Sequence, residues 1–197
     1  MKKLYAKLLT LAALCGLTAC GGAVANLQVF NASPDAPALD VLLDNEVVVA
    51  GLQDFAFQQY QEVDAGNTGI RVNEAGTSRT LTELGAALSG NQSYTLIVLN
   101  FVDELGTLLL TDDNSIDQAS TAKVRLVNAA PSAPALDFYF TAPGVDLNTV
   151  APLVSDLSFQ EVSLYLVVGA STYQVRATQA GTKTVLVDSG NFVLSQS

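Results

Sequence analysis

Short apolar runs alternate with turn residues along the chain from Leu27 onward. The runs are rich in β-branched and aromatic residues, and clusters of Gly, Pro, Asn and Asp separate them, which is typical of strands joined by turns. The predicted strands of the first half are 27–30, 39–43, 46–50, 57–63, 69–72, 79–84, 94–100 and 105–110. No sustained helical periodicity follows the N-terminal segment. This pattern favours an all-β fold of antiparallel, immunoglobulin-like β-sandwich type.

The decapeptide Asn31–Asp40 returns almost unchanged as Asn128–Asp137. Beyond it, Tyr165 falls opposite Tyr60, and the turn Ala180–Thr182 falls opposite Ala75-Gly76-Thr77. A repeat at a domain-sized spacing indicates one unit folded twice. We therefore expect two tandem sandwich domains, 27–111 and 122–197, joined by a polar linker, 112–121. Extra residues of the second copy fall in a loop at 141–154, where an insertion costs little.

The second copy ends before counterparts of the strands predicted at 94–100 and 105–110. Two absent strands would remove much of a small core, which favours a truncated sequence as the explanation. The alternative is that the open edge accepts a strand from another chain.

The first residues have the pattern of a cleaved export signal, which we place at 1–19. Lys2, Lys3 and Lys7 precede the apolar run 8–14, which is far shorter than the ~20 residues of a membrane-spanning helix. Leu17-Thr18-Ala19-Cys20 resembles the lipobox of bacterial lipoproteins. The resemblance implies acylation of the Cys20 thiol and a lipidated tether, 20–26. Gly21 resembles the Gram-negative pattern for transfer to the outer membrane, so we expect a lipid-anchored envelope protein there.

Charge excludes one class of partner. Nine basic and nineteen acidic residues give a net charge of −10, and three of the lysines would leave with the signal. Nucleic-acid binding needs clustered Lys and Arg, so we expect no nucleic-acid partner and membrane contact only through the lipid.

The sequence offers little for catalysis. It has no His, and Cys15 and Cys20 are its only cysteines, one within the signal and one at the lipidation position. Histidine triads, histidine metal sites and thiol nucleophiles are therefore excluded from the mature part. No phosphate-binding glycine loop occurs, and no Trp is present to stack on a sugar. We expect a non-enzyme without a cofactor.

The densest group of oxygen ligands is the run 112–117, in which Asp112, Asp113 and Asp117 are candidate calcium ligands. Calcium needs six to eight oxygens, and this run lacks the spacing, the central Gly and the terminal Glu of an EF-hand. The pattern favours a solvated linker over a calcium-stabilised joint.

A candidate ligand loop comprises Asp35, Asp40, Asp137 and Tyr139. Asp40 and Asp137 each follow a core leucine, so we expect them to accept backbone N–H bonds at strand ends. Turn and strand-end chemistry is the favoured interpretation, and a shared ligand loop is the alternative. Aromatic clusters occur at 55–60, 138–140 and 165; roughly half of each should face the core, and we expect Tyr139 to be exposed.

The repeated N-A-x-P-x-A-P-A-L-D start, the loop Phe140–Gly144 and the Ala-Gly-Thr turns resemble the bacterial domain of unknown function family 4397. The resemblance implies exported, often lipidated, tandem β-sandwich proteins of the cell envelope, without an established activity. Here it would be present twice, with the second copy incomplete. We expect a structural or interaction module with an unidentified protein or glycan partner. The alternative is an envelope ligand-binding protein that uses its loops for a glycan or calcium.

Overall fold

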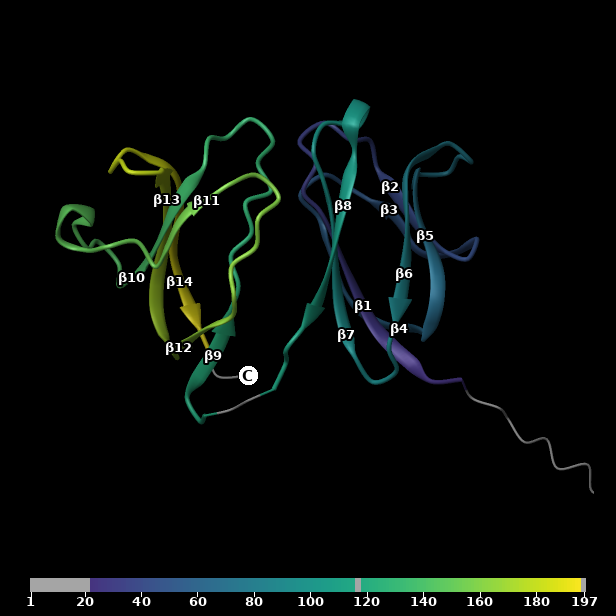
Figure 1. The fold of residues 1–197 in the computed structure, drawn as a ribbon, viewed down its shortest axis with the longest axis horizontal. Coiled ribbons are helices and arrows are strands. Elements are labelled where there is room, and N and C mark those ends of the chain that lie inside the picture. Colours follow the sequence, from purple (N-terminus) through teal and green to yellow (C-terminus); the bar gives the residue numbers. More distant parts are fainter. Residues whose placement is uncertain (1–21, 116–117, 196–197) are drawn as a thin grey trace, which may run out of the picture.

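The computed structural model describes residues 22–115 and 118–195 (Figure 1). The predicted all-β class is confirmed: these residues form strands and two short 3-10 turns, η1 (Val102–Glu104) and η2 (Leu147–Thr149). No helix in this part of the chain is long and apolar enough to cross a bilayer. The predicted signal 1–19 and Cys20 lie outside the described residues.

Eight strands of the first half of the chain form two four-stranded sheets. One has the order β4 (Phe57–Asp64), β1 (Val24–Asn31), β7 (Ser93–Leu99), β8 (Gly106–Asp112). The other has the order β3 (Glu46–Leu52), β2 (Leu39–Leu43), β5 (Gly66–Glu74), β6 (Thr80–Leu88). The main core draws on both sheets: Leu27 and Leu96 come from the first, Leu39 and Ile70 from the second, and all four are fully buried.

Two features of this half differ from the sequence prediction. The chain changes sheets at Ala65, because β4 ends at Asp64 and β5 starts in the other sheet at Gly66. Gly66 has φ of +144°, a conformation that favours glycine. In addition, β1 pairs with β7 in parallel. Parallel neighbours need a long connection, and here the chain forms β2 to β6 between them.

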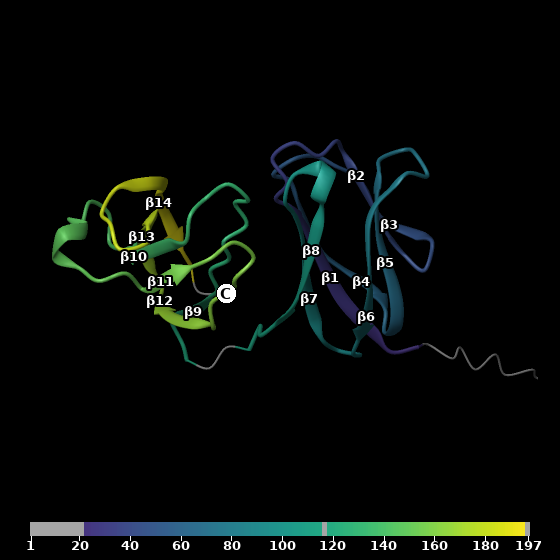
Figure 2. The ribbon, with the colours of Figure 1, turned by 45° about the horizontal axis from the view of Figure 1, so that its top comes forward.

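The second half contributes a four-stranded sheet and a two-stranded sheet (Figure 2). The first has the order β11 (Val154–Leu157), β10 (Leu136–Thr141), β13 (Ser171–Gln179), β14 (Val185–Leu194), and the second pairs β12 (Leu166–Gly169) with β9 (Thr121–Val124). Within the described residues, β9 pairs with one neighbour, whereas β1 pairs with both β4 and β7. Large apolar side chains of this half are more exposed, Leu164 and Val193 by 86% and 72%.

A second, smaller apolar cluster joins the two halves. Ile97 and Leu99 of β7 are buried at its centre, and Val127, Ala129 and Phe159 from the second half pack against it. The outer face of the β4-β1-β7-β8 sheet is therefore covered in part by the second half of the chain.

Candidate functional site

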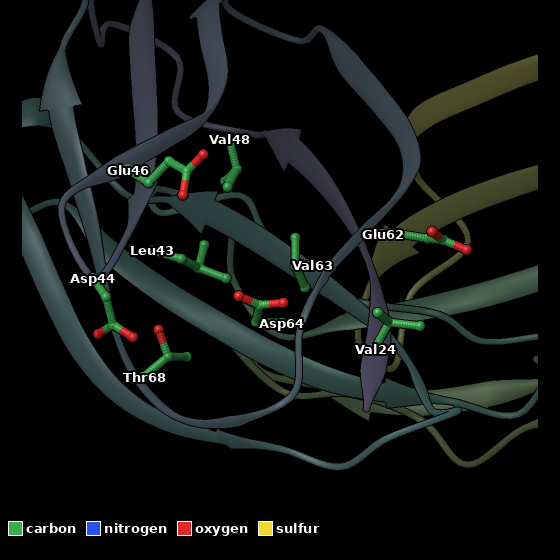
Figure 3. Close-up of a pocket in the computed structure, with 9 residues that line it drawn as sticks. All are labelled: Val24, Leu43, Asp44, Glu46, Val48, Glu62, Val63, Asp64 and Thr68. Carbon is green, nitrogen blue, oxygen red and sulfur yellow. The ribbon is translucent and has the colours of Figure 1, made fainter. Parts of the chain in front are cut away.

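An acidic pocket of about 300 Å³ lies between β3 and β4, the edge strands of the two sheets in the first half (Figure 3). Four acidic side chains line it, and no lysine or arginine does. The lining comprises Val24, Leu43, Asp44, Glu46, Val48, Glu62, Val63, Asp64 and Thr68. Figure 3 shows Glu62 directed away from the other three carboxylates, so Asp44, Glu46 and Asp64 form its inner acidic group.

Local structure fixes the positions of these carboxylates. Asp44 and Asn45 have φ of 47° and 79°, which identifies the two-residue hairpin turn that joins β2 to β3. Gly69 N donates to Asp44 Oδ1 at 2.8 Å, so the turn is held against β5. Gln61 Nε2 donates to Val48 O at 2.5 Å and links β4 to β3 beside the pocket. These two hydrogen bonds fix the β2–β3 turn and the neighbouring part of β4 beside the pocket.

Most of the acidic side chains and one hydroxyl in the pocket lack a partner within the described residues. The side chains of Glu46, Glu62 and Asp64 form no hydrogen bond or ion pair within 22–115 and 118–195. Thr68 is 9% exposed, and its hydroxyl is buried without a hydrogen-bond partner. Leaving a buried hydroxyl unpaired costs free energy, so such a group needs an explanation.

Sequence reasoning missed this pocket. Glu62 and Asp64 lie two residues apart along a strand, and Asp44 and Glu46 lie two residues apart at the junction of the predicted strands 39–43 and 46–50. Both are common patterns of solvated surface charge. The one feature of the sequence that hints at the pocket is that both acidic pairs occur in or next to strands predicted for the same domain. Their proximity depends on how the two sheets pack.

A polar cluster around Asp112 joins the two halves of the chain. Asp112 ends β8 and is buried, with a side chain only 4% exposed. Tyr60 Oη and Thr95 Oγ1 donate to its Oδ2 at 2.7 and 2.6 Å. From the second half, Arg125 donates to its Oδ1 at 2.5 Å, and the Tyr165 hydroxyl lies 3.4 Å from the same atom.

Tyr60 and Tyr165, which the sequence repeat places opposite each other, thus meet at one carboxylate. Burial is the main cause that raises the pKa of each tyrosine, with a smaller contribution from the Asp112 charge. The Arg125 guanidinium also lies over the Tyr165 ring, 4.6 Å from its centroid. This arrangement neutralises a buried charge and holds the two halves together.

Of the calcium candidates, Asp112 is buried, whereas the Asp113 side chain is 50% exposed, as a solvated linker would have it. Asp112 accepts from Arg125, and Asp113 accepts from Lys123 at 2.6 Å, so both face cationic side chains of the chain itself. Asp117 lies outside the described residues. Among the residues that the structure does describe, no three acidic or cysteine side chains are placed to hold a metal ion.

The candidate ligand loop is held by backbone contacts. Asp40 accepts from Gly51 N and Gly76 N, each at 2.8 Å. Asp137 accepts from Asp156 N and Gly181 N, each at 2.9 Å. Both aspartates therefore accept backbone N–H groups as predicted. Asp35, at the tip of its turn, accepts from Val102 N at 2.8 Å.

Tyr139 is 1% exposed, so its predicted exposure was wrong. The residue lies on β10, a central strand, and side chains alternate between its two faces. Lys183 Nζ contacts the hydroxyl at 2.9 Å and lies 4.6 Å from the ring centroid, which satisfies the polar end of the side chain. Phe55 and Phe57 are instead the most exposed aromatic residues of the described chain, by 63% and 52%, followed by Phe101 and Tyr60.

Residues 25–139 match the family described as Domain of unknown function (DUF4397). The matched range begins in β1, contains all four carboxylates of the acidic pocket and ends in β10. No curated protein matches the chain.

Proposed function

The chain belongs to the DUF4397 family, whose description names no activity, and we propose that it is a lipid-anchored, non-enzymatic interaction module of a bacterial cell envelope. The proposal includes a cleaved signal at 1–19, acylation at Cys20 and an outer-membrane location. It also includes two copies of one immunoglobulin-like sandwich.

The non-enzymatic part of the proposal is supported by the state of the buried carboxylates. Asp112 and Asp137 are the buried acidic residues of the described chain, and both accept hydrogen bonds from their own protein. A carboxylate acting as a general acid or base needs a proton exchanging with substrate. The carboxylate oxygens of Asp112 and Asp137 instead accept hydrogen bonds that hold strands and turns in place.

The duplication is supported by equivalent hydrogen bonds in the two halves. Besides the matched aspartates, Ala75 N bonds Ala38 O, and Ala180 N bonds Ala135 O. Gly76 and Gly181 have φ of 72° and 73°, so the two Ala-Gly-Thr turns share one conformation. Equivalent residues making equivalent bonds are expected of a duplicated unit.

The anchor is supported by the basic head, the apolar run and the residue at which the folded part begins. β1 starts at Val24, so only 21–23 separate its first residue from Cys20. A thioether-linked lipid would therefore hold the first strand close to the membrane surface.

Substitution of the two cysteines tests the anchor. Cys20→Ser is expected to move the protein from the membrane fraction to the soluble fraction and to abolish incorporation of an alkyne-tagged palmitate. Cys15→Ser is the matched control, because this thiol leaves with the proposed signal, and it should change neither readout. A Cys20→Ser protein that still fractionates wholly with membranes would contradict the proposal.

A further inference from the structure

We propose that the acidic pocket between β3 and β4 binds an alkyl ammonium group. The inference names a ligand class for the proposed interaction module, and it rests on the pocket rather than on the lipid anchor. The first observation in support is the group formed by three carboxylates: Asp44 from the β2–β3 turn, Glu46 from β3 and Asp64 from β4 (Figure 3). Three carboxylates around one cavity with no lining cation repel one another, and a bound cation relieves that repulsion.

The second observation is that the hydroxyl of Thr68 has no hydrogen-bond partner. The hydroxyl is buried without a hydrogen bond, although it lines the pocket. In Figure 3 its oxygen is turned toward Asp44 and Asp64. An ammonium group carries three donors and no acceptor, so it can bond the hydroxyl oxygen and two carboxylates at once. The ligand would supply the partner that the fold does not.

The apolar part of the lining suits an alkyl chain. Leu43 and Val63 are 8% and 7% exposed and face the cavity alongside Val24 and Val48. Long cationic side chains cover apolar surface with their methylene stems and place the charged head among polar groups. A volume of about 300 Å³ is at the small end of the range for ligand pockets, which fits an aminoalkyl group.

A divalent metal fits this pocket poorly. Calcium and magnesium need several oxygens at short, nearly equal distances. The described residues contain no set of acidic side chains arranged that way, the pocket included. An ammonium group is less demanding, since its hydrogen bonds can be directed to separate carboxylates.

The same chemistry has two sources, a lysine side chain of a partner protein and a free diamine. The test uses the full chain in zwitterionic micelles, titrated separately with Nα-acetyl-lysine methylamide and 1,5-diaminopentane. Backbone amide signals of Thr68 and Gly69 are followed by NMR. Saturable shifts of these signals are expected with both probes, and they should weaken as salt is added. Equal affinities indicate a lysine side chain as the natural ligand; at least tenfold tighter binding of the diamine indicates the free amine.

Variants of the lining residues distinguish amine binding in this pocket from nonspecific attraction of amines to the acidic surface. Asp64→Asn and Glu46→Gln should each weaken binding about tenfold, the size expected for loss of one charge-assisted hydrogen bond. Thr68→Val keeps the shape and removes the orphan hydroxyl, so it should weaken binding without lowering the thermal midpoint. Asp103→Asn is the control: it removes the same charge from the exposed η1 turn and should leave affinity unchanged.

Three results would each overturn the inference. The first is the absence of saturable shifts at Thr68 and Gly69 with either amine. The second is an equal loss of affinity in Asp103→Asn and Asp64→Asn. The third is calcium chloride shifting the same signals saturably at lower concentration than either amine. None of these readouts depends on acylation of Cys20, so failure here is distinguishable from failure of the anchor.

Discussion

Asp112 and Asp113 are neighbours in the sequence with opposite surroundings. The Asp112 side chain is 4% exposed and pairs with Arg125, whereas the Asp113 side chain is 50% exposed and pairs with Lys123. Alternation along the end of β8 explains the difference, since adjacent residues point to opposite sides of a strand. The buried pair carries a large desolvation cost that hydrogen bonds must offset, while the exposed pair is screened by water.

The exposed pair gives a prediction on pH. Hydrogen bonds from Lys123 and then Ser115 lower the pKa of Asp113 from 3.8 to about 2. Because the folded-state pKa is lowered, the pair stabilises the fold above pH 3.8 and loses this effect as pH falls through 2. Carbon-detected NMR titration should therefore find Asp113 ionised at pH 3. In Lys123→Met its pKa should rise toward 3.8; an unchanged low value would contradict the assignment to Lys123.

At the scale of elements, each repeat uses one aspartate to tie three chain segments together. Asp40 on β2 bonds Gly51 in β3 and Gly76 in the turn after β5. Asp137 on β10 bonds Asp156 in β11 and Gly181 in the turn after β13. Each carboxylate therefore fixes the register of a central strand against both neighbours.

Removing these carboxylates should destabilise both halves, the second more than the first. Asp137 is 6% exposed while Asp40 is half-buried, so the freed N–H groups around Asp137 have less access to water. We expect Asp137→Ala to cost about 3 kcal/mol and Asp40→Ala about 2 kcal/mol. Urea unfolding measures both, with the exposed Asp103→Ala as a control near zero. Equal, small effects at all three positions would contradict a structural role.

The sequence predicted most strands because their apolar alternation is local. The prediction 39–43 coincides with β2, and the prediction 46–50 lies within β3. It missed the sheet change at Gly66 and the parallel pairing of β1 with β7, since neither has a local signature. The exposure of Tyr139 failed for a related reason: three adjacent aromatic residues do not indicate which face of a strand meets the core.

At the scale of the whole molecule, the joint between the halves has an apolar part and a polar part. Ile97 and Leu99 pack with residues of the second half, and Asp112 binds Arg125 beside them. Removing one partner of a buried ion pair leaves an uncompensated charge, which costs more than the pair itself contributes.

Arg125→Met should therefore lower the free energy of unfolding by about 3 kcal/mol and loosen the joint. Arg79→Met is the matched control, because its ion pair with Glu74 is exposed by 66% and 35% and should contribute well under about 1 kcal/mol. Denaturant unfolding gives the energies, and small-angle scattering should show a larger radius of gyration for Arg125→Met alone. Identical behaviour of the two variants would show that the polar joint contributes little.

The sequence by itself determined the strand content, the turns and the repeated Asn31–Asp40 decapeptide, because each depends on residues close together in the chain. It also supplied the expectation of a lipid at Cys20, which lies outside the described residues. Only the tertiary structure brought Tyr60 and Tyr165 to one carboxylate and gathered the acidic pocket. Those sites join residues from different strands, and their proximity follows from sheet packing, which local pattern does not encode.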